Sequence, residues 1–170
     1  MTKPAYRQAR SLYAYESPLR EAIHAFKYQK NLAVGGILEQ LLVTGLPPCL
    51  DVDLVVPVPL ASDRLRDREY NQSLRLAHAA ASVLQRPMDY WSLRRRPGGT
   101  PQTLLPRQAR LRNLRHTFEV RQPDNLHGCH ILLIDDVLTT GTTVNECAKA
   151  LRKAGSGDVT VVTLARTLSG

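Results

Sequence analysis

Residues 131–143 read Ile-Leu-Leu-Ile-Asp-Asp-Val-Leu-Thr-Thr-Gly-Thr-Thr, and this stretch decides the fold class. Its apolar start, 131–134, is typical of a strand that is buried on both faces of a parallel sheet. Residues 142–154 have the apolar spacing of a helix that packs by one face. Ligands of open α/β sheets bind beyond the carboxyl ends of the strands, which is where we expect Asp135 and Asp136.

The turn between this strand and the helix has the composition of an anion site. A helix N-terminus presents unpaired backbone amides and the positive end of the helix dipole. Gly141 lets the backbone approach a ligand closely, and hydroxyl donors flank it at Thr139, Thr140, Thr142 and Thr143. The chain contains neither Gly-x-x-x-x-Gly-Lys-Ser/Thr nor Gly-x-Gly-x-x-Gly, so the turn predicts a phosphate site of another kind.

Two neighbouring carboxylates beside a phosphate site indicate a ligand that also carries hydroxyls or a metal. Vicinal ribose hydroxyls donate to carboxylates, and Mg²⁺ can bridge them. A ribose 5-phosphate would therefore satisfy the carboxylates and the turn together. The alternative is that Asp135 and Asp136 only cap and solubilise the end of the strand, and the surrounding pattern of residues 131–143 favours the ligand.

The rest of the chain alternates predicted strands and helices. Apolar spacing and capping residues predict helices at 17–28, about 37–43 and 71–84, and β-branched runs predict strands at 54–56, 116–120 and 159–164. Pro57 and Pro59 must end the first of these strands. The alternation predicts an α/β fold, a mostly parallel sheet flanked by helices, and the lack of repeats and linkers predicts a single domain over residues 1–170.

The composition is that of an ordinary soluble protein, with 43% hydrophobic and 22% charged residues. No apolar run reaches the about 18 residues of a membrane span, and the first residues do not resemble a signal peptide. We therefore expect a cytoplasmic protein with no membrane partner. Cys49, Cys129 and Cys147 are odd in number and far apart, which indicates buried thiols rather than disulfides or a zinc site.

The net charge of +8 is concentrated in one stretch. Between Ser92 and Arg121 the only acid is Glu119, and the local charge is +7, from the arginines at 94, 95, 96, 107, 110, 112, 115 and 121. Such a field attracts phosphorylated ligands or nucleic acid, the alternative being a solvated face. Interspersed Pro and Gly residues predict a long loop at about 94–115.

With four apolar residues, two acids, two apolar residues and then Thr-Thr-Gly, the stretch 131–143 resembles the phosphoribosyl pyrophosphate signature of the type I phosphoribosyltransferases. The resemblance implies that fold and a phosphoribosyl ligand. It also implies that Asp135 and Asp136 contact the ribose hydroxyls and that residues 139–143 bind the 5-phosphate.

Outside the signature the chain resembles the ComF/GntX family of competence-associated proteins, from about Tyr13 to Arg166. The matching pieces are residues 24–28, 56–60, 68–72, Thr100-x-Gln102, 112–113 and Phe118. Members of that family usually begin with a four-cysteine zinc module, and this sequence begins after the position of that module, either as a short form or as a truncated one. Glu69 stands where the family has a glycine, so a carboxylate lies beside Arg68.

The same resemblance implies where pyrophosphate binds and what closes over it. The loop after Val56 would bind pyrophosphate, and arginines are suited to bidentate contacts with phosphate. Its candidate residues are Pro59, Leu60, Arg64 and Arg68. The basic loop would be the flexible segment that closes and excludes water, with Arg94, Gln102, Arg107 and Arg112 as its candidates.

The activity implied by the resemblance is displacement of Mg²⁺-pyrophosphate from ribose C1 by a nitrogen nucleophile. This reaction depends on positioning and on stabilising the leaving group, so it requires no serine or cysteine nucleophile. Mg²⁺ would enter with the ligand rather than in a protein cage, and Asp135 and Asp136 are the carboxylates nearest to it. The acceptor, and whether the chain turns over at all, stay open.

The alternative function is that of a non-catalytic accessory protein of DNA uptake. Such a protein would bind single-stranded DNA or a helicase partner through the arginine-rich loop, since arginines contact backbone phosphates. An aromatic content of 5% offers few platforms for stacked bases, which weighs against this alternative.

Overall fold

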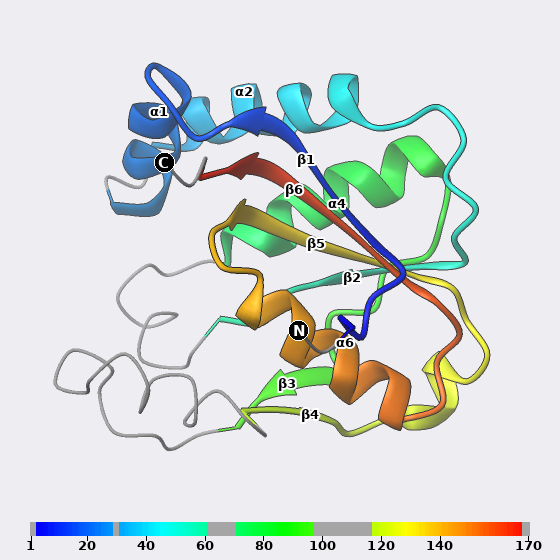
Figure 1. Ribbon diagram of the computed structural model, residues 1–170. Helices are drawn as coiled ribbons and strands as arrows, with labels where there is room; N and C mark the ends of the chain where they lie inside the picture. The colour runs from blue at the N-terminus through cyan, green and yellow to red at the C-terminus, as the bar shows by residue number, and fades with distance from the viewer. Residues whose placement is uncertain (1–2, 29–30, 61–70, 97–116, 168–170) are drawn as a thin grey trace, which may run out of the picture.

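The computed structural model describes residues 3–28, 31–60, 71–96 and 117–167. In these ranges, strands and helices follow one another along the chain (Figure 1). The elements are β1 (Gln8–Ala14), α1 (Leu19–Tyr28), α2 (Leu32–Gly45), β2 (Leu54–Pro57), α4 (Gln72–Leu84), β3 (Leu93–Arg95), β4 (Phe118–Val120), a 3-10 helix (Pro123–Leu126), β5 (Ile131–Leu138), α6 (Thr142–Lys153) and β6 (Val159–Arg166).

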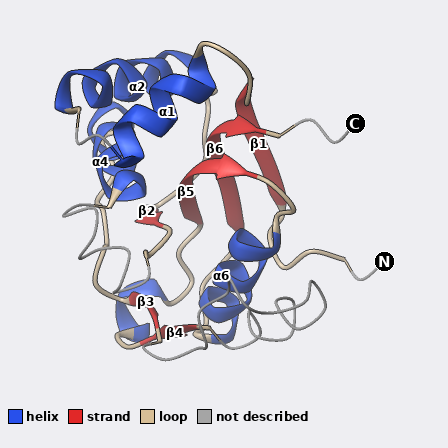
Figure 2. Ribbon diagram, turned by 90° about the vertical axis from the view of Figure 1, so that its left-hand side faces the viewer, coloured by secondary structure: helices blue, strands red, loops and turns tan. Residues whose placement is uncertain are grey.

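The described strands form a main sheet in the order β1-β6-β5-β2, with every neighbouring pair parallel. Helices α1, α2 and α4 cover one face of this sheet, and α6 lies on the other (Figure 2). Strands β3 and β4 pair antiparallel in a small separate sheet beside α6. The prediction of a mostly parallel sheet flanked by helices is confirmed.

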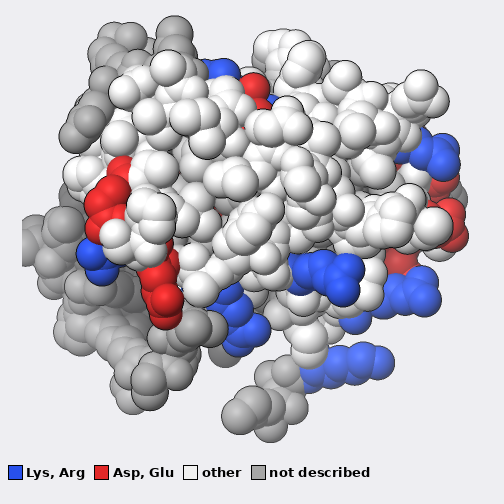
Figure 3. Space-filling view, turned by 90° about the horizontal axis from the view of Figure 1, so that it is seen from above, with Lys and Arg blue, Asp and Glu red and all other residues white. Residues whose placement is uncertain are grey.

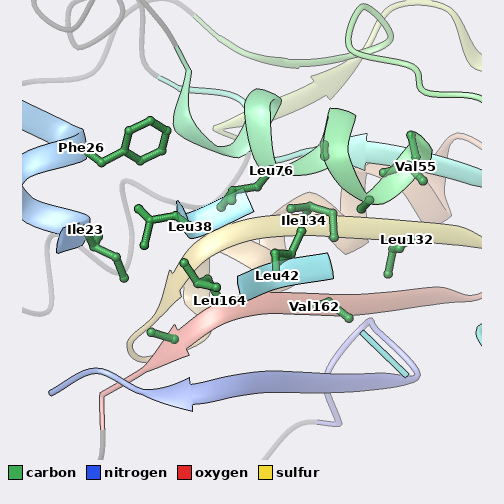
Figure 4. Close-up of a cluster of buried hydrophobic side chains, with 14 of the residues drawn as sticks. Ile23, Phe26, Leu38, Leu42, Val55, Leu76, Leu132, Ile134, Val162 and Leu164 are labelled. Atoms are coloured by element: carbon green, nitrogen blue, oxygen red, sulfur yellow. The ribbon is translucent and has the colours of Figure 1, made fainter. Parts of the chain in front are cut away.

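Strand β5 contributes to the hydrophobic core on both of its faces. Leu132 and Ile134 pack with Ile23 and Phe26 of α1 and with residues of α2 and α4 (Figure 4). Ile131 and Leu133 pack in a second cluster with the inner face of α6. A strand between two apolar layers needs an unbroken apolar run, which is why residues 131–134 show no alternation.

Strand β5 is longer than the sequence predicts, and this changes the position of the acidic pair. Its pairing with β6 continues to Leu138, opposite Arg166, so Asp135 and Asp136 lie within the strand rather than after it. On its other side, β2 ends at Pro57, which is paired with Ile134. Asp135 and Asp136 therefore lie in the part of β5 that extends past the end of β2 and still pairs with β6.

Three elements differ from the prediction because their local signal is weak. Strand β1 is an edge strand with mostly exposed side chains, so it lacks an apolar pattern. Helix α2 begins at Leu32 rather than near residue 37, although Gly35 and Gly36 disfavour a helix. Arg94, expected at the start of the basic loop, lies in β3, paired with Glu119 of β4.

No helix in the described part of the chain has the length and apolar character needed to cross a lipid bilayer.

Candidate functional site

Several elements come together at the carboxyl end of β5 (Figure 1), and polar side chains from them are in contact there. Asp135 and Asp136 come from β5 itself, and the turn 139–143 follows directly and leads into α6. The last turn of α1 contributes Lys27 and the first turn of α4 contributes Ser73. The predicted acids and threonines thus share one edge of the sheet with two residues that the sequence did not single out.

Asp136 forms an ion pair with Lys27 that is largely shielded from water. The distance from Lys27 Nζ to Asp136 Oδ2 is 2.6 Å, and the exposed fractions of the two side chains are 18% and 13%. The neighbouring Phe26 is buried in the core and anchors this turn of α1. Lys27 lies in the segment 24–28 that carries the family resemblance, and that was the available signal for it.

Asp135 accepts hydrogen bonds from two donors. Ser73 Oγ donates to Asp135 Oδ1 at 2.8 Å, and the backbone N–H of Asp136 donates to the same oxygen at 3.0 Å. Burial and then the charge of Asp136 raise the pKa of Asp135 to about 7, against the opposing effect of the Ser73 hydrogen bond. Near neutral pH this carboxyl is therefore balanced between its acid and carboxylate forms.

The raised pKa of Asp135 predicts a pH-dependent stability difference between the native chain and Asp135→Asn. A raised pKa means that the folded state holds this proton more tightly than the unfolded state, whose carboxyl titrates near 3.8. Stability contributed by Asp135 is therefore present below about pH 4, is lost as pH rises toward about 7, and is constant above that. We expect Asp135→Asn to be the more stable protein at pH 8, with the gap shrinking toward pH 5. Urea unfolding of both proteins at several pH values measures this, and a gap that does not change with pH contradicts it.

The turn 139–143 has the geometry of an anion site at a helix N-terminus. Gly141 precedes α6 with a φ of 76°, in the left-handed region, and provides no side chain to cap the helix. The hydroxyls of Thr140 and Thr142 are 2.9 Å apart, and the backbone N–H of Thr142 donates to Thr140 Oγ1 at 3.4 Å. The hydroxyls and amides that an anion would use are thus gathered at one point.

The N-terminal segment borders this turn, which the sequence did not predict. The backbone N–H of Ala5 donates to Asn145 Oδ1 of α6 at 2.8 Å. The hydroxyl of Tyr6 lies 3.6 Å from the point where a Cβ on Gly141 would be. Tyr6 therefore belongs to the wall of the site, although it is far from the turn in sequence.

The segment after β2 lies beside the aspartates. Val58 N–H donates to Ile134 O of β5 at 2.9 Å, and Asn71 Nδ2 donates to Val58 O at 3.2 Å. Pro59 and Leu60 follow and are partly buried. The candidate arginines of this loop, Arg64 and Arg68, lie outside the described residues.

Several arginines of the basic stretch have partners. Arg96 Nε and Arg121 Nε lie 2.9 and 3.1 Å from the two carboxylate oxygens of Glu119. The Arg94 guanidinium lies 4.8 Å from the centre of the Trp91 ring, and its Nε donates to Trp91 O at 2.9 Å. The remaining loop candidates, Gln102, Arg107 and Arg112, lie outside the described residues.

Protein groups already engage both aspartates. Across the described ranges, no group of three or more His, Cys, Asp or Glu residues is placed to hold a metal ion. Asp136 is already neutralised by Lys27, and one oxygen of Asp135 is taken by two hydrogen bonds. Mg²⁺ usually keeps several waters and is held by one or two carboxylates together with substrate phosphates, so the two aspartates are at most part of its ligand set. The same arrangement suits a ligand that donates hydroxyls to the carboxylates and places an anion on the turn.

The sequence is similar to a family model and to several curated proteins. The phosphoribosyl transferase domain matches residues 71–170. The DNA utilization protein YhgH of Salmonella typhi is 33% identical over 97% of this chain and 74% of its own length. Competence protein F of Haemophilus influenzae is 31% identical over 89% of this chain and 69% of its own. The competence protein ComFC of Bacillus subtilis is 29% identical over 95% of this chain and 65% of its own length.

Solved structures share the fold at low sequence identity. Glutamine phosphoribosylpyrophosphate amidotransferase from B. subtilis, complexed with ADP and GMP, is 19% identical and aligns with a TM-score of 0.52. The alignment covers 76% of this chain and 25% of that enzyme. Adenine phosphoribosyltransferase from Thermoanaerobacter pseudethanolicus is 17% identical, with a TM-score of 0.50 over 82% of this chain and 83% of that one.

Proposed function

Because this chain belongs to the ComF family and carries a phosphoribosyl transferase domain, we propose that it binds phosphoribosyl pyrophosphate at the carboxyl end of β5. We further propose that it transfers the phosphoribosyl group to a nitrogen nucleophile. The observation that carries the proposal is the adjacency of two carboxylates to a hydroxyl-rich helix N-terminus on one sheet edge. A sugar phosphate matches both parts of this arrangement.

Each part of the site has a role in the proposed complex. Asp135 and Asp136 accept from the ribose hydroxyls, and Thr139, Thr140, Gly141, Thr142 and Thr143 bind the 5-phosphate through amides and hydroxyls. Pro59 and Leu60, which follow the anchored Val58, border the pyrophosphate in this proposal, and Arg64 and Arg68 of the same loop are the proposed cationic contacts to it. When bound, Mg²⁺ neutralises the pyrophosphate and so makes it a better leaving group. The chain's own contribution is to orient ribose C1 and to exclude water.

We propose that the protein acts in the cytoplasm. Cys49, Cys129 and Cys147 are all free thiols, as is typical of proteins in a reducing compartment.

Calorimetric titration of the chain with phosphoribosyl pyrophosphate and Mg²⁺ tests the proposed binding. We expect one site per chain and weaker binding of ribose 5-phosphate, which lacks the pyrophosphate. A folded protein that binds neither ligand contradicts the proposal. If binding is found, release of pyrophosphate in the presence of candidate bases and amines then tests the transfer step and identifies the acceptor.

A second candidate function, binding of single-stranded nucleic acid, is favoured by an exposed aromatic pair. Tyr90 and Trp91 are 42% and 55% exposed, and their ring centres are 4.7 Å apart. Arg94 lies over Trp91 at the start of the basic stretch. Aromatic rings beside arginines are what single strands use for stacking and for phosphate contacts. By contrast, the face over α1 and α2 is mostly uncharged (Figure 3), so we place the nucleic acid away from it.

Replacing Arg94, Arg95 and Arg96 together by alanine separates the two functions. If these residues bind a single strand, the affinity for DNA falls, and the slope of log affinity against log salt becomes shallower by roughly 0.7 for each DNA phosphate that the variant no longer neutralises. We expect this result with little change in the affinity for phosphoribosyl pyrophosphate. Arg121→Ala is the matched control, because Arg121 shares the Glu119 partner of Arg96 but follows β4. Loss of phosphoribosyl pyrophosphate binding with an unchanged salt slope for DNA would instead assign the three arginines to a lid. If the variant keeps its affinity for both ligands, the three arginines are a solvated face.

A further inference from the structure

The proposed function gives Asp136 a role but gives none to Lys27, its partner in an ion pair. The ion pair joins the last turn of α1 to the ribose-binding strand at 2.6 Å, and most of both side chains is withdrawn from water. Ion pairs in such places gain little net stability over apolar side chains, because both charges lose hydration. A function for the pair is therefore worth seeking in the site that it borders.

We propose that Lys27 is a positioning residue that occupies the cation position at Asp136 and keeps the two aspartates free of divalent metal until a ligand arrives. The identity of that ligand rests on the proposed function, but the action of Lys27 on the aspartates does not. Any metal that the reaction uses then enters on the pyrophosphate of the ligand.

The charges of the site support this role. Asp135 and Asp136 are adjacent, and their mutual repulsion would make an attractive position for a divalent cation if no positive group were present. Lys27 lowers the repulsion, and it is one of the groups that act on the pKa of Asp135. The ammonium of lysine is a compact point charge, so it fills a cation position without adding a planar group that would cover both carboxylates.

The packing of α1 also supports the proposed role of Lys27. Ile23 and Phe26 on the same helix are fully or almost fully buried, so the last turn cannot move easily away from the sheet. Phe26 also lies against α2, since a Cβ on Gly35 would come within 2.8 Å of its Cε2 atom. The side chain of Lys27 therefore reaches Asp136 from a fixed base rather than from a mobile surface.

Titration with Mn²⁺ alone tests the proposal without any phosphoribosyl ligand. The electron paramagnetic resonance signal of free Mn²⁺ measures how much of the metal stays unbound. Lys27→Met keeps the length of the side chain and removes its charge. We expect it to bind Mn²⁺ at least roughly tenfold more tightly than the native chain, a difference of about 1.4 kcal/mol. The gain should disappear in Lys27→Met combined with Asp136→Asn, and Lys27→Arg should behave like the native chain.

Lys149→Met is the matched control, because Lys149 also pairs with a carboxylate at 2.6 Å, that of Glu146, but away from the aspartates. Its affinity for Mn²⁺ should equal that of the native chain. Circular dichroism verifies that each variant is folded, and Lys27→Gln replaces Lys27→Met if the latter is not. Equal Mn²⁺ affinity of the native chain and the folded, uncharged Lys27 variant overturns the proposal. Because no sugar phosphate is present, this failure is distinct from a failure to bind phosphoribosyl pyrophosphate.

Discussion

Replacing Asp135 and Asp136 together by asparagine is expected to weaken phosphoribosyl pyrophosphate binding by about a hundredfold or more while leaving the fold intact. Hydrogen bonds to a charged acceptor contribute about 1.5 to 3 kcal/mol each, and the double substitution removes the carboxylate of Asp136 and the ionised form of Asp135. The fold should persist because asparagine has the size of aspartate, and the Ser73 hydroxyl can still donate to an amide oxygen.

Calorimetry with Mg²⁺ present measures this loss, and circular dichroism with urea unfolding verifies the fold. Asp158→Asn is the matched control, because Asp158 is a partly exposed aspartate that pairs with Arg7 and Arg152 away from the site. It should bind like the native chain. Unchanged affinity in the folded double variant would remove the central claim about the site.

Replacing Gly141 by valine is expected to abolish measurable binding of ribose 5-phosphate. The sequence predicts the loss from crowding of the anion, and the structure adds a stronger reason. The φ of Gly141 is 76°, which a β-branched residue adopts only with strain of about 1–2 kcal/mol or more. Among the described residues, a Cβ would meet Tyr6 and Leu138, at 3.6 and 3.9 Å, so the main cost there is in the backbone of the turn and not in packing.

Two further variants separate strain from crowding. Asparagine tolerates the left-handed region, so Gly141→Asn should keep the turn and lose less affinity than Gly141→Val. Gly36→Ala is the control, since a Cβ on Gly36 of α2 would meet no atom of the described residues within 4 Å. Direct titration with ribose 5-phosphate measures the affinity of Gly141→Val, Gly141→Asn and Gly36→Ala. Full affinity in Gly141→Val would show that the turn does not bind the phosphate.

The sequence by itself determines the parts of this protein whose physics is local. The apolar run of β5, the glycine and threonines of the turn and the apolar face of α6 are contiguous, so their spacing predicts strand, turn and helix together. The same stretch predicts the anion site, because helix N-terminus, glycine and hydroxyls all lie within a few residues of one another.

Only the tertiary structure decides which distant residues complete the site. Ser73 reaches Asp135 from 62 residues away in the chain. Lys27 of α1 and Tyr6, which precedes β1, both come long before residues 131–143 in the sequence. The position of the aspartates was also decided there, since β5 continues to Leu138 only because β6 pairs with it along that length. A hydrophobic pattern records which face of an element is buried, but it does not record which element packs against that face. The partners of Asp135 and Asp136 therefore follow from the packing of α1 and α4 on the sheet.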